Sequence, residues 1–191
     1  LWWQRLHLAQ DPGTYHYTAA PPWDNALAST LVHNTLSLDG REQMTRAGRF
    51  LYLDWAQAAP VRRDQAGDGS FARLRTSHNG YRRWGVTHAR QVTAFKDARW
   101  RVEDNLQGRS RQTHTARLHW LLPDLPWQAE FALQNLSLLL TTPLGLVELT
   151  VRAERPLQPS LVRAGKLLLG EGEVHPTWGW TSPTYGDKMP A

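Results

Sequence analysis

The sequence predicts an all-β protein, an antiparallel two-sheet β-sandwich of the supersandwich kind. Three observations predict this fold class. Apolar and polar residues alternate with a period of two in several segments, and turn-forming dipeptides recur at a spacing of about ten residues. Sustained helical periodicity is hard to find in the chain. A chain of 191 residues can bury a core of its own, so we expect one domain over residues 1–191.

The predicted strands follow the chain from its first quarter onward. Short apolar and aromatic runs predict strands at TYHY, residues 14–17, and at STLV, residues 29–32. Residues 45–59 could be read as a helix, but Gly48 and the aromatic residues of this segment favour strand. The later strands are predicted by clear alternation in RWRVEDNL (99–106), HTARLHWLL (114–122) and LVELTVRAE (146–154).

The longest apolar stretch, residues 136–151, predicts two buried strands joined by a turn. Pro143, Gly145 and Glu148 interrupt it. It is also shorter than the roughly 18–20 apolar residues that a helix needs to cross a bilayer. We therefore expect no membrane partner.

Composition and charge limit the classes of protein and of binding partner that this sequence allows. Hydrophobic residues make up 41% of the chain and there are ten Trp, which excludes a disordered or coiled-coil protein. The net charge of +5 and the pI of about 10.0 favour an anionic partner, but basic residues occur only as short pairs typical of a solvated surface. We expect an acidic polysaccharide before nucleic acid. The absence of Cys excludes disulfides and thiolate metal sites.

A candidate metal site involves Asp11 and His33. Asp11 precedes Pro-Gly, and His33 lies in TLVHNTLSLDGREQM, where a strand would carry valine more readily. Carboxylate oxygen and imidazole nitrogen are zinc ligands, so the two could meet at a divalent cation across neighbouring strands. Two ligands are too few for a complete site. The alternatives are an Asp that forms a turn and a His that bonds backbone groups.

Candidate substrate-binding residues lie farther along the chain. His88 and Arg90 are two apart in a predicted strand, so they share a face and could contact a uronate carboxylate. Tyr81, beside Gly80, could stack on a sugar ring. The alternative is an ordinary solvent face. For Trp178, Trp180 and Tyr185 of PTWGWTSPTYG, packing in a core or an interface is favoured over stacking on a sugar.

Five motifs in order give a family resemblance. They are DPGTYHYTAAPPWDNALASTLVHNTLSLDGREQM, HNGYRRWGVTHARQV, RWRVEDNLQG, HTARLHWLLPDLPW and GWTSPTYGDKMPA. Together they resemble the C-terminal β-sheet region of the heparinase II/III family of polysaccharide lyases, which also contains alginate lyases. The resemblance covers nearly the whole chain.

The resemblance implies a fold, a metal and a partner. Family members pack this β-domain against an N-terminal α/α-toroid, absent from this chain, and hold an acidic polysaccharide between the two. A histidine, an aspartate and the histidine of an H-N-T motif hold a structural divalent metal, usually zinc. Asp11 and His33 match the aspartate and the H-N-T histidine, and the first histidine of the set would lie upstream of Leu1. Asn34 is expected to face away from the metal and to bond the following turn.

The resemblance also implies where catalysis occurs. The family's catalytic tyrosine and its carboxylate neutraliser lie in the toroid, and its catalytic histidine lies just ahead of this region. No catalytic residue can therefore be placed on this chain, and we expect the chain alone to be inert. The chain begins at Leu1 without a start residue, and it stops at GDKMPA, where the resemblance implies further strand. We therefore expect it to be truncated at both ends. We expect a periplasmic or extracellular bacterial location.

The function predicted from the sequence is the C-terminal β-domain of a lyase that cleaves uronate-containing polysaccharide by β-elimination. Such a domain forms one wall of the substrate cleft and holds the structural metal. The alternative is a free-standing, non-catalytic carbohydrate-binding β-sandwich. Nucleic-acid binding is a distant third and rests only on the net charge of +5 and the aromatic residues.

Overall fold

A computed structural model describes residues 1–108 and 112–191. It confirms the predicted fold class: the protein is all-β, with 45% strand and 5% helix. Three single turns of 3₁₀-helix account for the helical residues described. Every pairing between named strands is antiparallel, and the open sheets are consistent with a β-sandwich. No helix among the described residues is long and apolar enough to cross a membrane.

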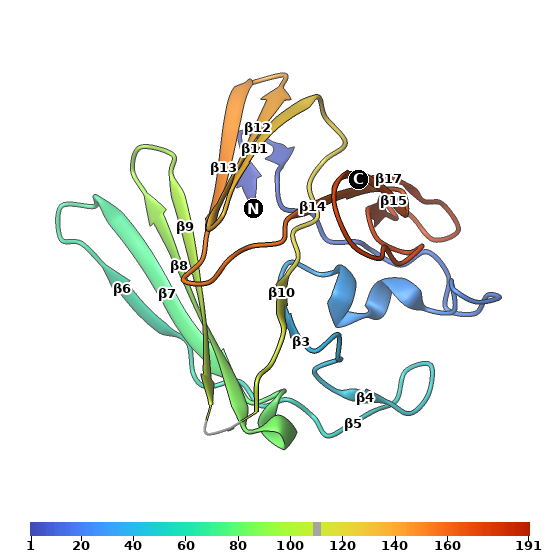
Figure 1. The fold of residues 1–191 in the computed structure, drawn as a ribbon. Coiled ribbons are helices and arrows are strands. Elements are labelled where there is room, and N and C mark those ends of the chain that lie inside the picture. Colours follow the sequence, from blue (N-terminus) through green and yellow to red (C-terminus); the bar gives the residue numbers. More distant parts are fainter. Residues whose placement is uncertain (109–111) are drawn as a thin grey trace. The chain divides into compact units, whose positions relative to one another are not determined.

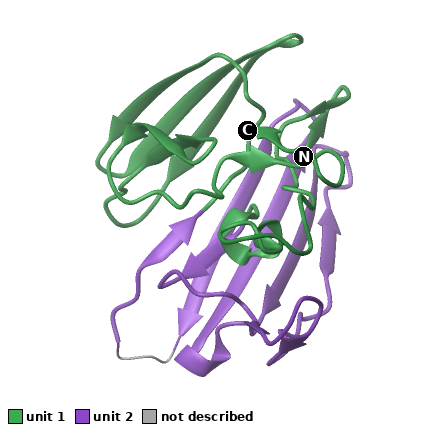
Figure 2. Ribbon diagram, turned by 90° about the vertical axis from the view of Figure 1, so that its right-hand side faces the viewer, with its two compact units in different colours: residues 1–34, 119–191 green, residues 35–118 purple. Residues whose placement is uncertain are grey.

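The chain divides into two compact units, coloured separately in Figure 2. Unit 1 comprises residues 1–34 and 119–191, and unit 2 comprises residues 35–118. Each unit is described in turn.

Unit 2 is built on a four-stranded sheet with the order β6-β7-β8-β9 (Figure 1). Two further strand pairs, β3 with β10 and β4 with β5, complete the unit. Its elements are β3 (Leu36–Leu38), β4 (Thr45–Arg46), β5 (Tyr52–Leu53), β6 (Arg62–Gln65), β7 (Phe71–His78), η3 (Arg82–Trp84), β8 (Val86–Phe95), β9 (Trp100–Gly108) and β10 (Ala116–Leu118). The alternation in residues 99–106 therefore predicted β9 correctly.

The core of unit 2 surrounds Tyr81. This ring is fully buried and packs with Leu38 and Val86, which are also buried. Its hydroxyl donates a hydrogen bond to the Leu36 carbonyl at 3.0 Å. Burial raises the pKa of Tyr81 to about 12, so the hydroxyl remains a donor. The turn that presents Tyr81 ends at Gly85, whose φ of 71° is left-handed and favours glycine.

Unit 1 contains a three-stranded meander and several two-stranded pairs. The meander has the order β11-β12-β13, and the pairs are β1 with β2, β14 with β15 and β16 with β17 (Figure 1). Its elements are β1 (Trp2–Trp3), β2 (Leu6–His7), η1 (Ala26–Ala28), η2 (Thr30–Val32), β11 (Trp127–Ala132), β12 (Asn135–Thr142), β13 (Gly145–Arg152), β14 (Ser160–Arg163), β15 (Lys166–Gly170), β16 (Trp180–Thr181) and β17 (Met189–Pro190).

The hairpin predicted over residues 136–151 is present as β12 and β13. Its burial differs from the prediction. Leu138 and Leu140 of β12 are buried, whereas β13 leaves Leu146 64% exposed. The hairpin therefore has one strand with buried apolar residues and one strand whose surface is largely open.

Three strand predictions were wrong in whole or in part. Residues 29–32 form the 3₁₀-helix η2 because the Ser29 hydroxyl accepts a hydrogen bond from the Leu31 N–H at 3.1 Å and caps the turn. Residues 14–17 form no strand. Within residues 114–122 only β10 is a strand, paired with β3. In the first case a local side-chain bond outweighed the β propensity of Thr, Leu and Val.

Candidate metal site and polar network

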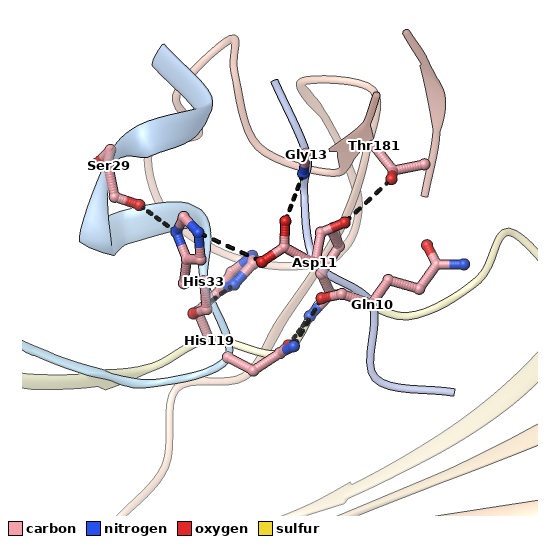
Figure 3. A network of polar contacts seen from close by, with 9 residues as sticks. Gln10, Asp11, Gly13, Ser29, His33, His119 and Thr181 are labelled. Atoms are coloured by element: carbon pink, nitrogen blue, oxygen red, sulfur yellow. Dashed lines mark hydrogen bonds and ion pairs between the residues drawn. The ribbon is translucent and has the colours of Figure 1, made fainter. Parts of the chain in front are cut away.

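His33 lies directly after η2, where its backbone is extended, with φ −98° and ψ 159°. The prediction that it sits within a strand was therefore wrong. Its Nδ1 lies 2.7 Å from the Ser29 carbonyl oxygen, which can only accept, so Nδ1 carries the proton. The remaining nitrogen, Nε2, lies 3.7 Å from Asp11 Oδ2 (Figure 3). The sequence-based pairing of these two residues is present in unit 1.

Asp11 also forms the turn that its sequence context predicts. Its Oδ1 accepts a hydrogen bond from the Gly13 N–H at 2.8 Å. Gly13 has a φ of 70°, and a Cβ at this position would lie 2.1 Å from the Ser182 carbonyl oxygen. Thr181 Oγ1 donates to the Asp11 carbonyl at 3.3 Å. One carboxylate oxygen therefore shapes the turn, while the other faces His33.

Asn34 explains why His-Asn occupies this position. Its Nδ2 donates to the Gln10 carbonyl at 2.7 Å, and its Oδ1 accepts from the Leu121 N–H at 2.6 Å. We expected Asn34 to bond the turn that follows it; it instead joins two segments distant in sequence. His119 Nδ1 donates to the His33 carbonyl at 3.2 Å. The backbone on either side of His33 is thus fixed by side-chain bonds.

The Asp11 and His33 pair fits part of a zinc site. Zinc binds these ligands at about 2.0–2.2 Å, so two ligands of one tetrahedral ion lie about 3.3 Å apart, close to the observed 3.7 Å. A backbone acceptor on the other imidazole nitrogen is the usual support for a metal-binding His. In the described residues no group of three or more His, Cys, Asp or Glu gathers to hold an ion. The ring of His16 instead packs against Tyr15 and Tyr185.

A separate polar network lies on the β7-β8-β9 part of unit 2. His88 Nε2 lies 2.6 Å from Asp104 Oδ1, and Arg90 holds the same carboxylate through Nε at 2.6 Å and Nη2 at 2.9 Å. Burial opposes ionisation of Asp104, but the bonds from His88 and Arg90 hold its pKa below the ordinary value. Asp104 is therefore a buried carboxylate with two cationic or donating partners.

His78 extends this network by one residue. The Gly80 N–H donates to His78 Nδ1 at 3.2 Å, which leaves the proton on Nε2, and Nε2 lies 2.9 Å from His88 Nδ1. His88 then donates through Nε2 to Asp104. Burial, and with it the charge of Arg90, lowers the pKa of His78 to about 4. The chain of bonds is self-consistent only while His78 is neutral.

This geometry changes the interpretation of the predicted substrate-binding residues. Tyr81 is 0% exposed, so its ring offers no face to a sugar, and His88 is 2% exposed. His88 and Arg90 do share a face, as predicted, but both are directed at Asp104. Arg90 retains 23% side-chain exposure. We therefore place Tyr81 and His88 in the supporting structure of unit 2.

A shallow depression of about 250 Å³ lies over β7, β8 and β9. The pairing register aligns Arg75, Gln91 and Glu103 in one row across these strands. The depression is lined by Arg75, Thr76, Ala89, Arg90, Gln91, Glu103 and Asn105. It is open, and Arg90 is the one predicted substrate-binding residue in its lining.

Sequence reasoning missed two residues of these sites. Asp104 falls in the same alternating register as Val102 and Leu106, where a carboxylate signals a buried partner. Ser29 precedes a short helical turn, and a Ser at that position is a common cap. Both signals were present in the sequence.

The comparisons with known proteins give a family. The family model described as heparinase II/III-like, C-terminal matches residues 1–191. The chain therefore belongs to the heparinase II/III-like C-terminal domain family. No curated protein and no solved structure matches the chain significantly.

The pKa of His78 leads to a prediction about pH. Because the folded state keeps His78 neutral down to about pH 4, while an unfolded histidine titrates near 6.5, its contribution to stability is fully present above pH 6.5 and is lost as the pH falls toward 4. His78→Gln keeps a donor toward His88 but does not titrate. The free energy of unfolding of this variant, measured by urea denaturation, is expected to vary less between pH 6.5 and 4 than that of the wild type.

His7→Gln, which removes a histidine outside this network, serves as the control and is expected to keep the wild-type slope. Parallel pH profiles for the wild type and His78→Gln contradict the assignment.

Proposed function

We propose that this chain is the C-terminal β-domain of a polysaccharide lyase that cleaves uronate-containing polysaccharide by β-elimination. In this role it forms one wall of the substrate cleft and holds a structural divalent metal. The family match over residues 1–191 carries the proposal. The Asp11 and His33 geometry adds support, because the residues that the family resemblance marks as ligands lie 3.7 Å apart.

The reaction requires groups beyond those of this chain. The C5 proton of the uronate is removed, the bond from C4 to the glycosidic oxygen breaks, and that oxygen leaves with a proton as the C4–C5 double bond forms. A base and a neutraliser of the uronate carboxylate must act together. The resemblance assigns both to a helical N-terminal domain or to the segment just before this chain, so the partner of this β-domain is that helical domain. A periplasmic or extracellular location belongs to the same proposal.

The proposed metal is structural. Asp11 through Oδ2 and His33 through Nε2 would hold it, and the bound ion would cross-link the Asp11 turn to the end of η2. Zinc suits one imidazole and one carboxylate, and the remaining ligands would come from solvent or from outside residues 1–191. The His33 ring needs no rearrangement for this, since its Nδ1 is already bonded to Ser29. Within unit 2, Arg90 is the residue that keeps a proposed role in uronate binding.

The function predicts a specific product. The full-length protein that carries this chain is expected to release unsaturated uronate ends from an acidic polysaccharide such as alginate, pectate or heparan sulfate. The new double bond is conjugated to the carboxylate, so ultraviolet absorbance reports the product. Residues 1–191 alone are expected to release none, because the groups that act at C5 are absent and each such group contributes about 10²–10⁴ in rate. Polysaccharide binding without cleavage by the full-length protein favours the non-catalytic binding module instead.

The proposed metal site leads to a prediction about the melting temperature in the presence of zinc. Zinc is expected to raise the melting temperature of the full-length protein by about 3 °C or more when it is present at about 100 times its Kd. Asp11→Ala and His33→Ala are each expected to abolish most of this shift, as measured by calorimetry.

The matched control is His175→Ala, which removes a unit 1 histidine that bonds Thr177. It is expected to keep the full zinc-dependent shift. Equal shifts in all four proteins show that neither Asp11 nor His33 is a ligand.

A further inference from the structure

Lys188 lies within a frame of three aromatic rings in unit 1. Its Nζ is 3.3 Å from the ring centroid of Trp180, 4.2 Å from that of Trp23 and 5.5 Å from that of Tyr15. Attraction between an ammonium and ring faces favours this arrangement. We refer to Lys188 with these three rings as the Lys188 cage.

The rings of the Lys188 cage support one another. Trp23 and Trp180 meet edge to face, with centroids 5.7 Å apart, and Tyr15 meets Trp23 in the same way at 5.4 Å. The backbone holds the frame as well, because the Gly186 N–H donates to the Tyr15 carbonyl at 2.8 Å. The cage is therefore assembled from two distant segments before any ligand arrives.

The charge of Lys188 is not matched by a carboxylate. Across residues 1–108 and 112–191, Lys188 forms no ion pair, and burial lowers its pKa. Aromatic faces attract a cation but do not neutralise it. A partly desolvated ammonium without a carboxylate partner favours an anionic group beside it.

Exposed tyrosines adjoin the cage. Tyr17 is 41% exposed and Tyr185 is 56% exposed, and their ring centroids are 5.3 Å apart. The His16 ring connects them to the cage, since it packs on Tyr15 at 4.1 Å and on Tyr185 at 5.4 Å. Exposed rigid rings beside a cation can take the apolar face of a sugar while the cation takes its acidic group.

We propose that the Lys188 cage and the neighbouring Tyr17 and Tyr185 rings form a subsite for one acidic sugar unit. The Lys188 ammonium pairs with the carboxylate or sulfate of the sugar, and a tyrosine ring stacks on its pyranose face. This inference rests on the proposed function, since Lys188 would bind an acidic group of the same polysaccharide. It also gives the exposed Tyr185 a role beyond core packing.

The test uses the full-length protein and charge-altering variants. Lys188→Met keeps the aliphatic stem in the cage but removes the charge, whereas Lys188→Arg keeps the charge. Lys166→Met, at an exposed lysine of β15, is the matched control. Apparent affinity is measured as KM for a polysaccharide that is cleaved, or as Kd for one that is only bound. The two polysaccharides compared are alginate, which carries carboxylates alone, and heparan sulfate, which carries both carboxylates and sulfates.

Lys188→Met is expected to weaken the affinity for the acidic polysaccharide about tenfold, the usual effect of one charge-assisted hydrogen bond, with kcat little changed. Tyr185→Ala is expected to weaken it several-fold by loss of stacking. Lys188→Arg and Lys166→Met are expected to bind like the wild type. Loss on alginate shows that Lys188 pairs with the carboxylate, and loss on heparan sulfate alone shows that it pairs with the sulfate.

The outcomes separate this inference from the function on which it rests. If the wild type cleaves an acidic polysaccharide and Lys188→Met does so with unchanged KM, the subsite is wrong and the proposed function stands. If the wild type neither binds nor cleaves any of the polysaccharides, both fail. Tighter binding of single-stranded DNA than of polysaccharide, lost in Lys188→Met, overturns the assignment of the ligand.

Discussion

The carboxamide of Asn34 is the constraint on which the candidate metal site depends. It donates to the Gln10 carbonyl and accepts from the Leu121 N–H, so one side chain joins three segments of unit 1. A partly buried amide of this kind is costly to leave unpaired, and both of its ends are satisfied. Gln10 immediately precedes Asp11, and Asn34 immediately follows His33. The Asn34 bonds therefore bring the two candidate ligands together without any contribution from a metal.

The segment from Asp11 to Asn34 serves two purposes in this account. Its two ends provide the proposed metal ligands, and its middle provides Tyr15 and Trp23 to the Lys188 cage. The partner segment is shared as well, since Thr181 bonds the Asp11 carbonyl while the neighbouring Trp180 contacts Lys188. An ion at Asp11 and His33 would stabilise the same backbone that presents the proposed sugar subsite. A structural metal can thus affect substrate affinity without touching the reaction.

Local patterns predicted strands β9, β12 and β13 correctly, but they wrongly predicted strands at residues 14–17 and 29–32. Strand β9 could be predicted from the alternation of apolar and polar residues alone, because successive side chains of a strand point to opposite faces of the sheet. Residues 29–32 were misread, because a Ser29 hydroxyl bond decides the conformation there and strand propensity carries no information about it. The Asp11 and His33 pair was found through motif resemblance. The burial of Tyr81 and His88 could not be predicted, since it depends on packing with residues far away in sequence.

Anomalous diffraction at the zinc absorption edge, from crystals of the full-length protein grown with zinc, tests the central claim most directly. The account predicts one ordered peak bonded to His33 Nε2 and Asp11 Oδ2 at about 2.0–2.2 Å, with His33 Nδ1 still bonded to the Ser29 carbonyl. A further ligand from outside residues 1–191, or water, should complete the coordination. A direct His33 and Asp11 ion pair without an anomalous peak, or zinc bound only elsewhere in the protein, contradicts the account.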